Sequence, residues 1–188
     1  MTVGSLARLW GRILMVDIIL NREEIMEAVK IAHGRDAPKV AAGIKPSFGP
    51  GISNYDGHIT GALAELAAAK YYGVEVDNKF YGESGDGHQP DITFNGWGIE
   101  IKSTQYDPPI LKFNQLLDFN SDIALLCHVD RQQMKATAGE QITVNLAGVV
   151  SRNKFLNTCY RKSFGYGDRY CMAAASMANP SVLKERSK

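Results

Sequence analysis

Two carboxylates and a lysine, Asp91, Glu100 and Lys102, lie within a segment of twelve residues that reads DITFNGWGIEIK. In this segment, Asn95 and Gly96 separate two runs of alternating apolar residues. Asn-Gly between such runs is typical of a two-residue type I′ turn and predicts a β-hairpin. Carboxylates that converge on one point suit a hard divalent cation, because Mg²⁺ is commonly held by one or two of them. The segment therefore indicates metal-assisted chemistry.

The register of this hairpin follows from the turn. With Asn95 and Gly96 as the loop, Asp91 faces Glu100, at a Cβ separation of about 5 Å. Like charges at opposed positions destabilise a hairpin unless a cation lies between them. Alternation of side chains then predicts one apolar face, made of Ile92, Phe94, Trp97, Ile99 and Ile101. The other face carries Asp91, Thr93, Gly98, Glu100 and Lys102.

Lys102 lies one pleat beyond Glu100, where its ammonium group could steady a metal-bound water or a phosphate under attack. Gly98 leaves room for a ligand on the same face. The alternative interpretation is a solvated sheet face with an ion pair between Glu100 and Lys102. That alternative leaves the opposition of Asp91 and Glu100 unexplained.

The elements that must position these residues follow from periodicity, caps and turns. Asn21 is a helix cap, and the helix after it is expected to end at Gly34. Residues 35–58 are expected to form a loop. The remaining predicted elements are a helix over about 61–72, strands over 91–94, 98–103, 123–129 and 142–150, a helix over 153–161, and a strand over 170–175. We expect one mixed α/β domain, 58–188, with residues 1–57 as an N-terminal helix and loop extension.

Composition narrows the class of protein. The chain has 188 residues, of which 45% are hydrophobic and 22% charged, which excludes disordered, collagen-like and coiled-coil classes. Three dispersed cysteines fit a reducing cytoplasm. Arg8, Arg12 and Asp17 interrupt the apolar N-terminal segment, so we expect neither a membrane span nor a secretion signal. The native start is left open between Met1 and Met15.

Charge is unevenly distributed although the net charge is only +1. Residues 55–130 carry 4 basic and 12 acidic side chains, whereas residues 131–188 carry 10 basic and 3 acidic ones. The acidic part suits a divalent-metal site. The basic part is a candidate surface for phosphates, the alternative being a solvated helix face. Its clustered basic residues are Arg152, Lys154, Arg161, Lys162 and Arg169.

The pairing of Pro90-Asp91 with Glu100-Ile101-Lys102 resembles the PD-(D/E)XK nuclease superfamily. The resemblance covers about residues 58–160, and the expected order of helices and strands matches the αβββαβ core of that family. It implies a restriction-endonuclease-like fold, in which a central mixed sheet is flanked by helices.

The resemblance also implies roles for individual residues. Asp91 and Glu100 would bind the metal, with the Ile101 carbonyl nearby, and Lys102 would orient or deprotonate the nucleophilic water. Glu65, on a helix face of small residues, would be an additional or water-mediated ligand, and Gln105 an auxiliary catalytic residue. The alternatives are an exposed helix position for Glu65 and no catalytic role for Gln105.

From the residues and the resemblance we expect a Mg²⁺-dependent nuclease, with Mn²⁺ as substitute, that hydrolyses phosphodiester bonds in DNA through a metal-activated water. Endonuclease and exonuclease action both stay open, as does a homodimer, and a membrane partner is not expected. The small size is typical of phage or mobile-element enzymes. The alternatives are a catalytically silent nuclease-fold module that binds nucleic acid or a protein partner, and an unrelated structural α/β module.

Overall fold

The computed structural model describes residues 15–41, 43, 54–76, 89–130, 133, 140–165 and 167–186. Residues 1–14, on which the choice between Met1 and Met15 as the native start depends, lie outside these ranges. The helices and longer strands, in chain order, are β1 (Val16–Asn21), α2 (Arg22–Ala41), α3 (Asn54–Tyr72), β2 (Ile92–Phe94), β3 (Trp97–Thr104), β4 (Ile110–Phe113), β5 (Ile123–Val129), β6 (Gln141–Ser151), α5 (Arg152–Thr158), β7 (Tyr160–Ser163) and β8 (Asp168–Ala173). Short 3-10 turns are formed by Leu116–Asp118, Ala174–Ser176 and Pro180–Leu183.

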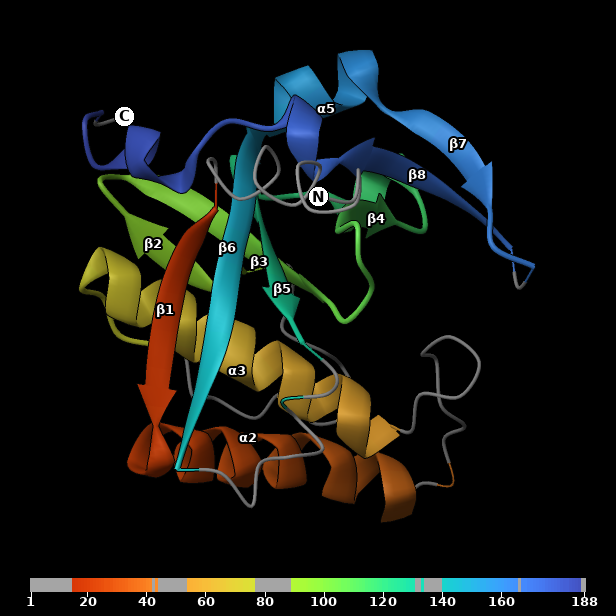
Figure 1. Ribbon diagram of the computed structural model, residues 1–188. Coiled ribbons are helices and arrows are strands. Elements are labelled where there is room, and N and C mark those ends of the chain that lie inside the picture. Colours follow the sequence, from red (N-terminus) through yellow and green to blue (C-terminus); the bar gives the residue numbers. More distant parts are fainter. Residues whose placement is uncertain are drawn as a thin grey trace, which may run out of the picture.

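The chain forms an α/β fold with two sheets. The larger sheet is mixed, in the order β1-β6-β5-β3-β2, and its β3 and β5 run parallel while the other neighbours are antiparallel. The smaller sheet is antiparallel, in the order β4-β8-β7. Helices α2 and α3 lie along one side of the larger sheet, and the smaller sheet and α5 lie on the other side (Figure 1). The expected mixed α/β class is therefore confirmed.

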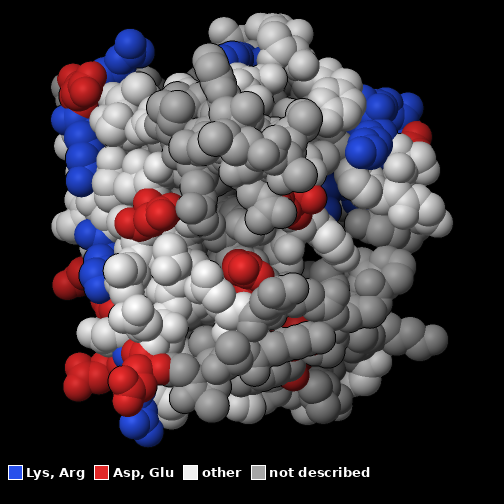
Figure 2. All heavy atoms as spheres, viewed as in Figure 1, with Lys and Arg blue, Asp and Glu red and all other residues white. Residues whose placement is uncertain are grey.

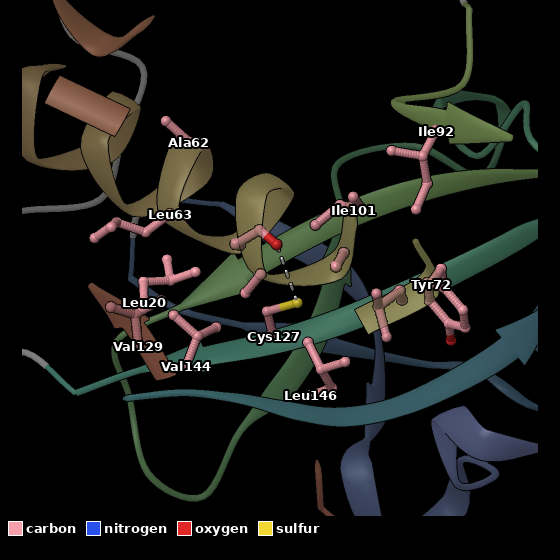
Figure 3. Packing of buried hydrophobic residues seen from close by; sticks show 14 of the residues in the cluster. Leu20, Ala62, Leu63, Tyr72, Ile92, Ile101, Cys127, Val129, Val144 and Leu146 are labelled. Atoms are coloured by element: carbon pink, nitrogen blue, oxygen red, sulfur yellow. Dashed lines mark hydrogen bonds between the residues drawn. The ribbon is translucent and has the colours of Figure 1, made fainter. Parts of the chain in front are cut away.

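The alternating side chains of β5 divide the interior into two apolar cores. Leu125 and Cys127 pack with α3 in the helix-side core, while Ala124 and Leu126 pack with β4, β8 and α5. The helix-side core is shown in Figure 3, where the buried face of α3 lies over β3, β5 and β6. Small residues of α3 allow this close approach, since Ala64 and its alanine neighbours are buried. Stacked and edge-on phenylalanines fill the second core: Phe113, Phe119 and Phe155.

The predicted hairpin is confirmed in its register. Phe94 pairs with Trp97, and Ile92 pairs with Ile99. Asn95 and Gly96 both have positive φ, at 49° and 80°, as a type I′ turn requires. Because the turn sets the register and the period is two, the expected apolar face packs into the helix-side core.

The first two helices differ from the prediction. Helix α2 continues through Gly34 to Ala41 and α3 begins at Asn54, so the expected loop was wrong at 35–41 and 54–58, as was the expected helix start at 61. The rest of the expected loop, apart from residue 43, lies outside the described residues. Packing is the physical reason: the two helices lie against each other along their lengths, which outweighs the local preference of Gly and Pro for loops. The expected division between residues 57 and 58 falls inside α3, and β1 from the N-terminal part pairs with β6.

The C-terminal part also differs. Helix α5 ends at Thr158, and Tyr160–Ser163 forms strand β7, where the sequence predicted a helix through 161. Cys159 takes an extended conformation, and the residues after it pair with β8. Strands β1 and β4 were missed, because each acquires its hydrogen-bond partners only from distant segments. Among the described helices, none is both long and apolar enough to span a bilayer.

Candidate active site

Asp91 lies immediately before β2, one position beyond the last pair of the β2–β3 ladder. Its Oδ2 accepts a hydrogen bond from the backbone N–H of Ile101 at 2.5 Å. The carboxylate therefore accepts the hydrogen bond that a backbone carbonyl would accept if the β2–β3 ladder continued. This hydrogen bond directs the Asp91 side chain toward β3. The paired residues of the hairpin end at Ile92 and Ile99, so the opposition of Asp91 to Glu100 stays a prediction.

The electrostatic surroundings of Asp91 bring together the residues that the sequence analysis singled out. Burial raises the pKa of Asp91 most, and the negative charges of Glu65 and Glu100 raise it further. The Ile101 N–H and the Lys102 ammonium act in the opposite direction, and the resulting pKa is about 7. Residues from α3 and from β3 therefore act on one half-buried carboxyl group. A clustered set of this kind with a perturbed pKa is typical of functional sites.

Glu65 approaches the site from α3 and is only 8% exposed, so the alternative of an exposed helix position was wrong. Its two oxygens accept hydrogen bonds from the Arg35 guanidinium, at 2.8 and 2.7 Å. This bidentate geometry is the strongest form of carboxylate–arginine pairing. Arg35 is a site residue that sequence reasoning missed, because it lies in the part of α2 that was expected to be a loop.

Glu100 and Lys102 project from the polar face of β3. Their side chains form an ion pair of 2.5 Å, with 17% and 38% of the two side chains exposed. The Lys102 ammonium also lies 5.3 Å from the ring centroid of Phe113 in β4. The ion pair that the alternative interpretation expected is therefore present, and it is present beside Asp91. Lys102 is held in place by a carboxylate and by an aromatic ring.

Gln105 follows β3 and contacts α3. Its Nε2 donates a hydrogen bond to Thr60 Oγ1 at 2.6 Å, and that hydroxyl donates to the Asp56 carbonyl at 2.6 Å. The end of β3 is thereby tied to the first half of the helix that carries Glu65. Gln105 thus helps to position these two elements relative to each other.

Cys127 lies beneath the site, in the apolar strand β5. Its side chain is fully buried, and Sγ lies 4.0 Å from the Ala64 carbonyl (Figure 3). Burial raises the pKa of this thiol, and the charges of Glu65 and Asp91 raise it further. The thiol is therefore kept neutral and contributes packing to the floor of the site.

The donor chemistry fits a hard divalent cation. Asp91 and Glu100 supply carboxylate oxygens, and Mg²⁺ is often bound by only one or two carboxylates with waters completing its shell. Within the described ranges, no group of three or more His, Cys, Asp or Glu side chains is arranged to hold a metal ion. In the present arrangement Glu65 is engaged by Arg35 and Glu100 by Lys102. A cation at Asp91 would therefore compete with these two pairs for the oxygens.

The five basic residues predicted to meet nucleic acid divide into two groups. On α5, Arg152 Nε donates to the Phe119 carbonyl at 2.6 Å and Lys154 Nζ to the Ser176 carbonyl at 2.9 Å. On β7 and β8, Lys162 is directly opposite Arg169, whereas Arg161 is opposite Tyr170 and pairs with Asp168 at 2.9 Å. Figure 2 shows basic side chains gathered over the part of the molecule where Figure 1 places β7. Lys162 and Arg169 thus share one sheet face, and Arg161 lies on the opposite one.

Comparisons with protein-family models, curated protein sequences and solved structures found no match to this chain.

Proposed function

We propose that this protein is a metal-dependent nuclease that hydrolyses phosphodiester bonds in DNA, on a restriction-endonuclease-like core. The observation that carries the proposal is the half-buried Asp91 carboxyl, on which Glu65 acts from α3 and Glu100 and Lys102 act from β3. Repulsion among carboxylates at one point is relieved by a divalent cation. The mixed sheet with α3 on one face supports the same interpretation.

Each residue has a role in this proposal. A bound Mg²⁺ or Mn²⁺ would supply an activated water and neutralise charge on the scissile phosphate. Asp91 and Glu100 would bind that ion, and Glu65 would bind it through water or after leaving Arg35. Lys102, held by Glu100 and Phe113, would orient the attacking water or the phosphate. Gln105 would hold the end of β3 against α3 through its hydrogen bond to Thr60.

The test is a cleavage panel of single-stranded, duplex and branched DNA with Mg²⁺ or Mn²⁺. Asp91→Asn and Lys102→Met are expected to abolish metal-dependent cleavage, because one removes a charged ligand and the other the ammonium group. Glu75→Gln is the matched control, since Glu75 is an exposed carboxylate just beyond α3. Absence of cleavage of every substrate by the native protein would overturn the enzyme proposal.

A specific observation favours a second candidate function, a silent nuclease-fold module that binds nucleic acid or a partner. The ion pairs Arg35–Glu65 and Lys102–Glu100 already compensate two of the three carboxylates. Calorimetric titration with Mn²⁺ separates the candidates. The nuclease requires binding that Asp91→Asn abolishes, whereas the silent module requires neither.

A further inference from the structure

The outer face of the β4–β8–β7 sheet collects three cations from three strands. Lys162 is directly opposite Arg169, and Lys112 is directly opposite Cys171, two residues along β8. Because side chains alternate between faces, Lys112, Lys162 and Arg169 lie on the same face. The other face packs Phe113 and Met172 into the phenylalanine core. Lys112 was missed at the sequence level because it lies alone in the acidic part of the chain.

These cations repel one another. Like charges at opposed positions of an antiparallel pair destabilise a sheet, as Lys162 and Arg169 do here. Within the described part of the chain, Lys112 and Lys162 have no carboxylate at ion-pair distance. Burial lowers the pKa of Lys112 most. Cys171 acts in the opposite direction, and the charges of Arg169 and Lys162 lower the pKa further. An anion bound on this face would relieve the repulsion.

Aromatic rings lie among the cations. The Lys112 ammonium is 5.3 Å from the ring centroid of Tyr106 and 4.9 Å from that of Phe164, and the Lys162 ammonium is 5.4 Å from the Phe164 centroid. Tyr106 is 48% exposed, and Tyr160, opposite Cys171 on the same face, is 44% exposed. Exposed rings beside these lysines present both a stacking surface and a charge for phosphates.

The hairpin turn between β7 and β8 permits this arrangement. Gly167 has a φ of +126°, and a Cβ at this position would lie 2.8 Å from a nitrogen of the Arg169 guanidinium. Gly165 also has positive φ, at 81°. Glycine at both positions supplies the positive φ of this turn, and the Arg169 guanidinium lies against Gly167.

We infer that this face, which we name the outer basic face (Tyr106, Lys112, Tyr160, Lys162, Phe164 and Arg169), binds single-stranded nucleic acid. Lysine and arginine would contact successive phosphates, and exposed rings would stack on bases. Bases in a duplex already stack on their neighbours, so the rings favour a single strand over a duplex. Binding of the strand to this face requires no metal. The further consequence, that the bound strand is the substrate, rests on the proposed function.

The test is fluorescence anisotropy of a labelled dT 20-mer with the full chain in EDTA, beside a 20-base-pair duplex and a glutamate 20-mer. Lys112→Gln/Lys162→Gln is expected to weaken dT binding at least tenfold. It should also reduce the slope of log affinity against log salt by about 1.4, or about 0.7 for each phosphate that the variant no longer neutralises. Tyr106→Ala should weaken binding about five- to hundredfold, because a base can no longer stack on its ring.

The control is Lys184→Gln, which removes a lysine whose ammonium lies 3.8 Å from the ring centroid of Tyr71, at a separate place in the fold. It is expected to bind dT like the native chain. If the double variant does not fold, the dT affinity of Lys162→Gln alone, a substitution at an exposed position, is measured instead. Equal affinity for duplex, tighter binding of the glutamate 20-mer, or unchanged dT affinity in folded variants would each overturn the inference.

This test separates the inference from the proposed function. Binding of dT in EDTA without any cleavage in Mg²⁺ would support the outer basic face and overturn the nuclease. Cleavage of duplex DNA by a chain that does not bind dT would overturn the outer basic face and leave the nuclease standing.

Discussion

The backbone N–H of Ile101 donates a 2.5 Å hydrogen bond to Oδ2 of Asp91. The carboxylate stands at the first position beyond the paired residues of β2 and β3 and accepts the bond that a strand carbonyl would otherwise accept. Burial, and then the charges of Glu65 and Glu100, raise the pKa of this carboxyl to about 7. The fold thus holds a carboxyl group whose ionisation is costly in the absence of a cation.

Asp91→Asn should therefore stabilise the metal-free protein. It should also reduce metal-dependent cleavage by more than about a hundredfold, since mutating even a residue that only contacts a metal ligand typically costs about 10–100-fold in metal affinity or activity. The folded-state pKa of Asp91 lies above its ordinary value of 3.8, so native stability falls as the pH rises from about 4 to about 7. Asparagine keeps an acceptor for Ile101 and carries no charge. Thermal melts should show a gain of about 3 °C or more at pH 8 and little gain at pH 4. A variant less stable than the native chain at pH 8 would contradict this account.

Metal affinity should depend on pH through the same carboxyl group. Because a ligand must lose its proton before it binds a cation, affinity for Mn²⁺ should fall about tenfold for each pH unit below 7. Above pH 7 the affinity should be nearly constant. Calorimetric titrations at pH 5.5, 6.5, 7.5 and 8.5 measure this dependence, with Glu75→Gln as the control. A pH-independent affinity over this range would show that Asp91 is not the titrating ligand.

Arg35→Gln should destabilise the protein by about 3 kcal/mol, because it leaves the Glu65 carboxylate buried without its cation. The same substitution frees the oxygens of Glu65 for a metal. Added Mn²⁺ should therefore raise the melting temperature of the variant more than that of the native chain. Differential scanning fluorimetry with and without Mn²⁺ measures both effects. Equal shifts in the two proteins would show that Glu65 does not reach the metal.

Alanine substitutions at Gly96, in the hairpin turn, and at Gly61, in α3, should change the stability of the fold in opposite directions. Gly96→Ala should destabilise the fold by about 1–2 kcal/mol, because alanine at a φ of 80° meets the steric cost of the left-handed region. Gly61→Ala, inside α3, should stabilise it by up to about 1 kcal/mol, because alanine favours the helix and its Cβ would have no neighbour within 4 Å. Urea unfolding measures both changes. A destabilising Gly61→Ala would show that this helix face is more crowded than the structure describes.

Local chemistry explains why part of the site was predictable. The register of the 92–99 hairpin depends on a two-residue turn and on alternation, both of which are visible in a dozen residues. The positions of Asp91, Glu100 and Lys102 on one hairpin followed from that register. Only the resemblance placed Glu65 in the predicted site, because no local sequence pattern indicates which face of α3 packs against the sheet.

Other elements were decided by contacts between distant segments. Gly34 and Pro38 indicate a helix end by local preference, yet α2 continues to Ala41 because its packing with α3 outweighs that preference. Residues 160 and 161 continue a helical pattern after α5, yet they form β7 because β8 supplies the partner strand.

By itself, the sequence determined the hairpin and its register from Ile92 to Ile99, since a tight turn acts over neighbouring residues. Only the tertiary structure decided that Arg35 neutralises Glu65 and that Lys112 shares a sheet face with Lys162 and Arg169. Those relationships join residues that are tens of positions apart. They depend on which faces of helices and strands are buried together, and that choice is made by the packing of the whole chain.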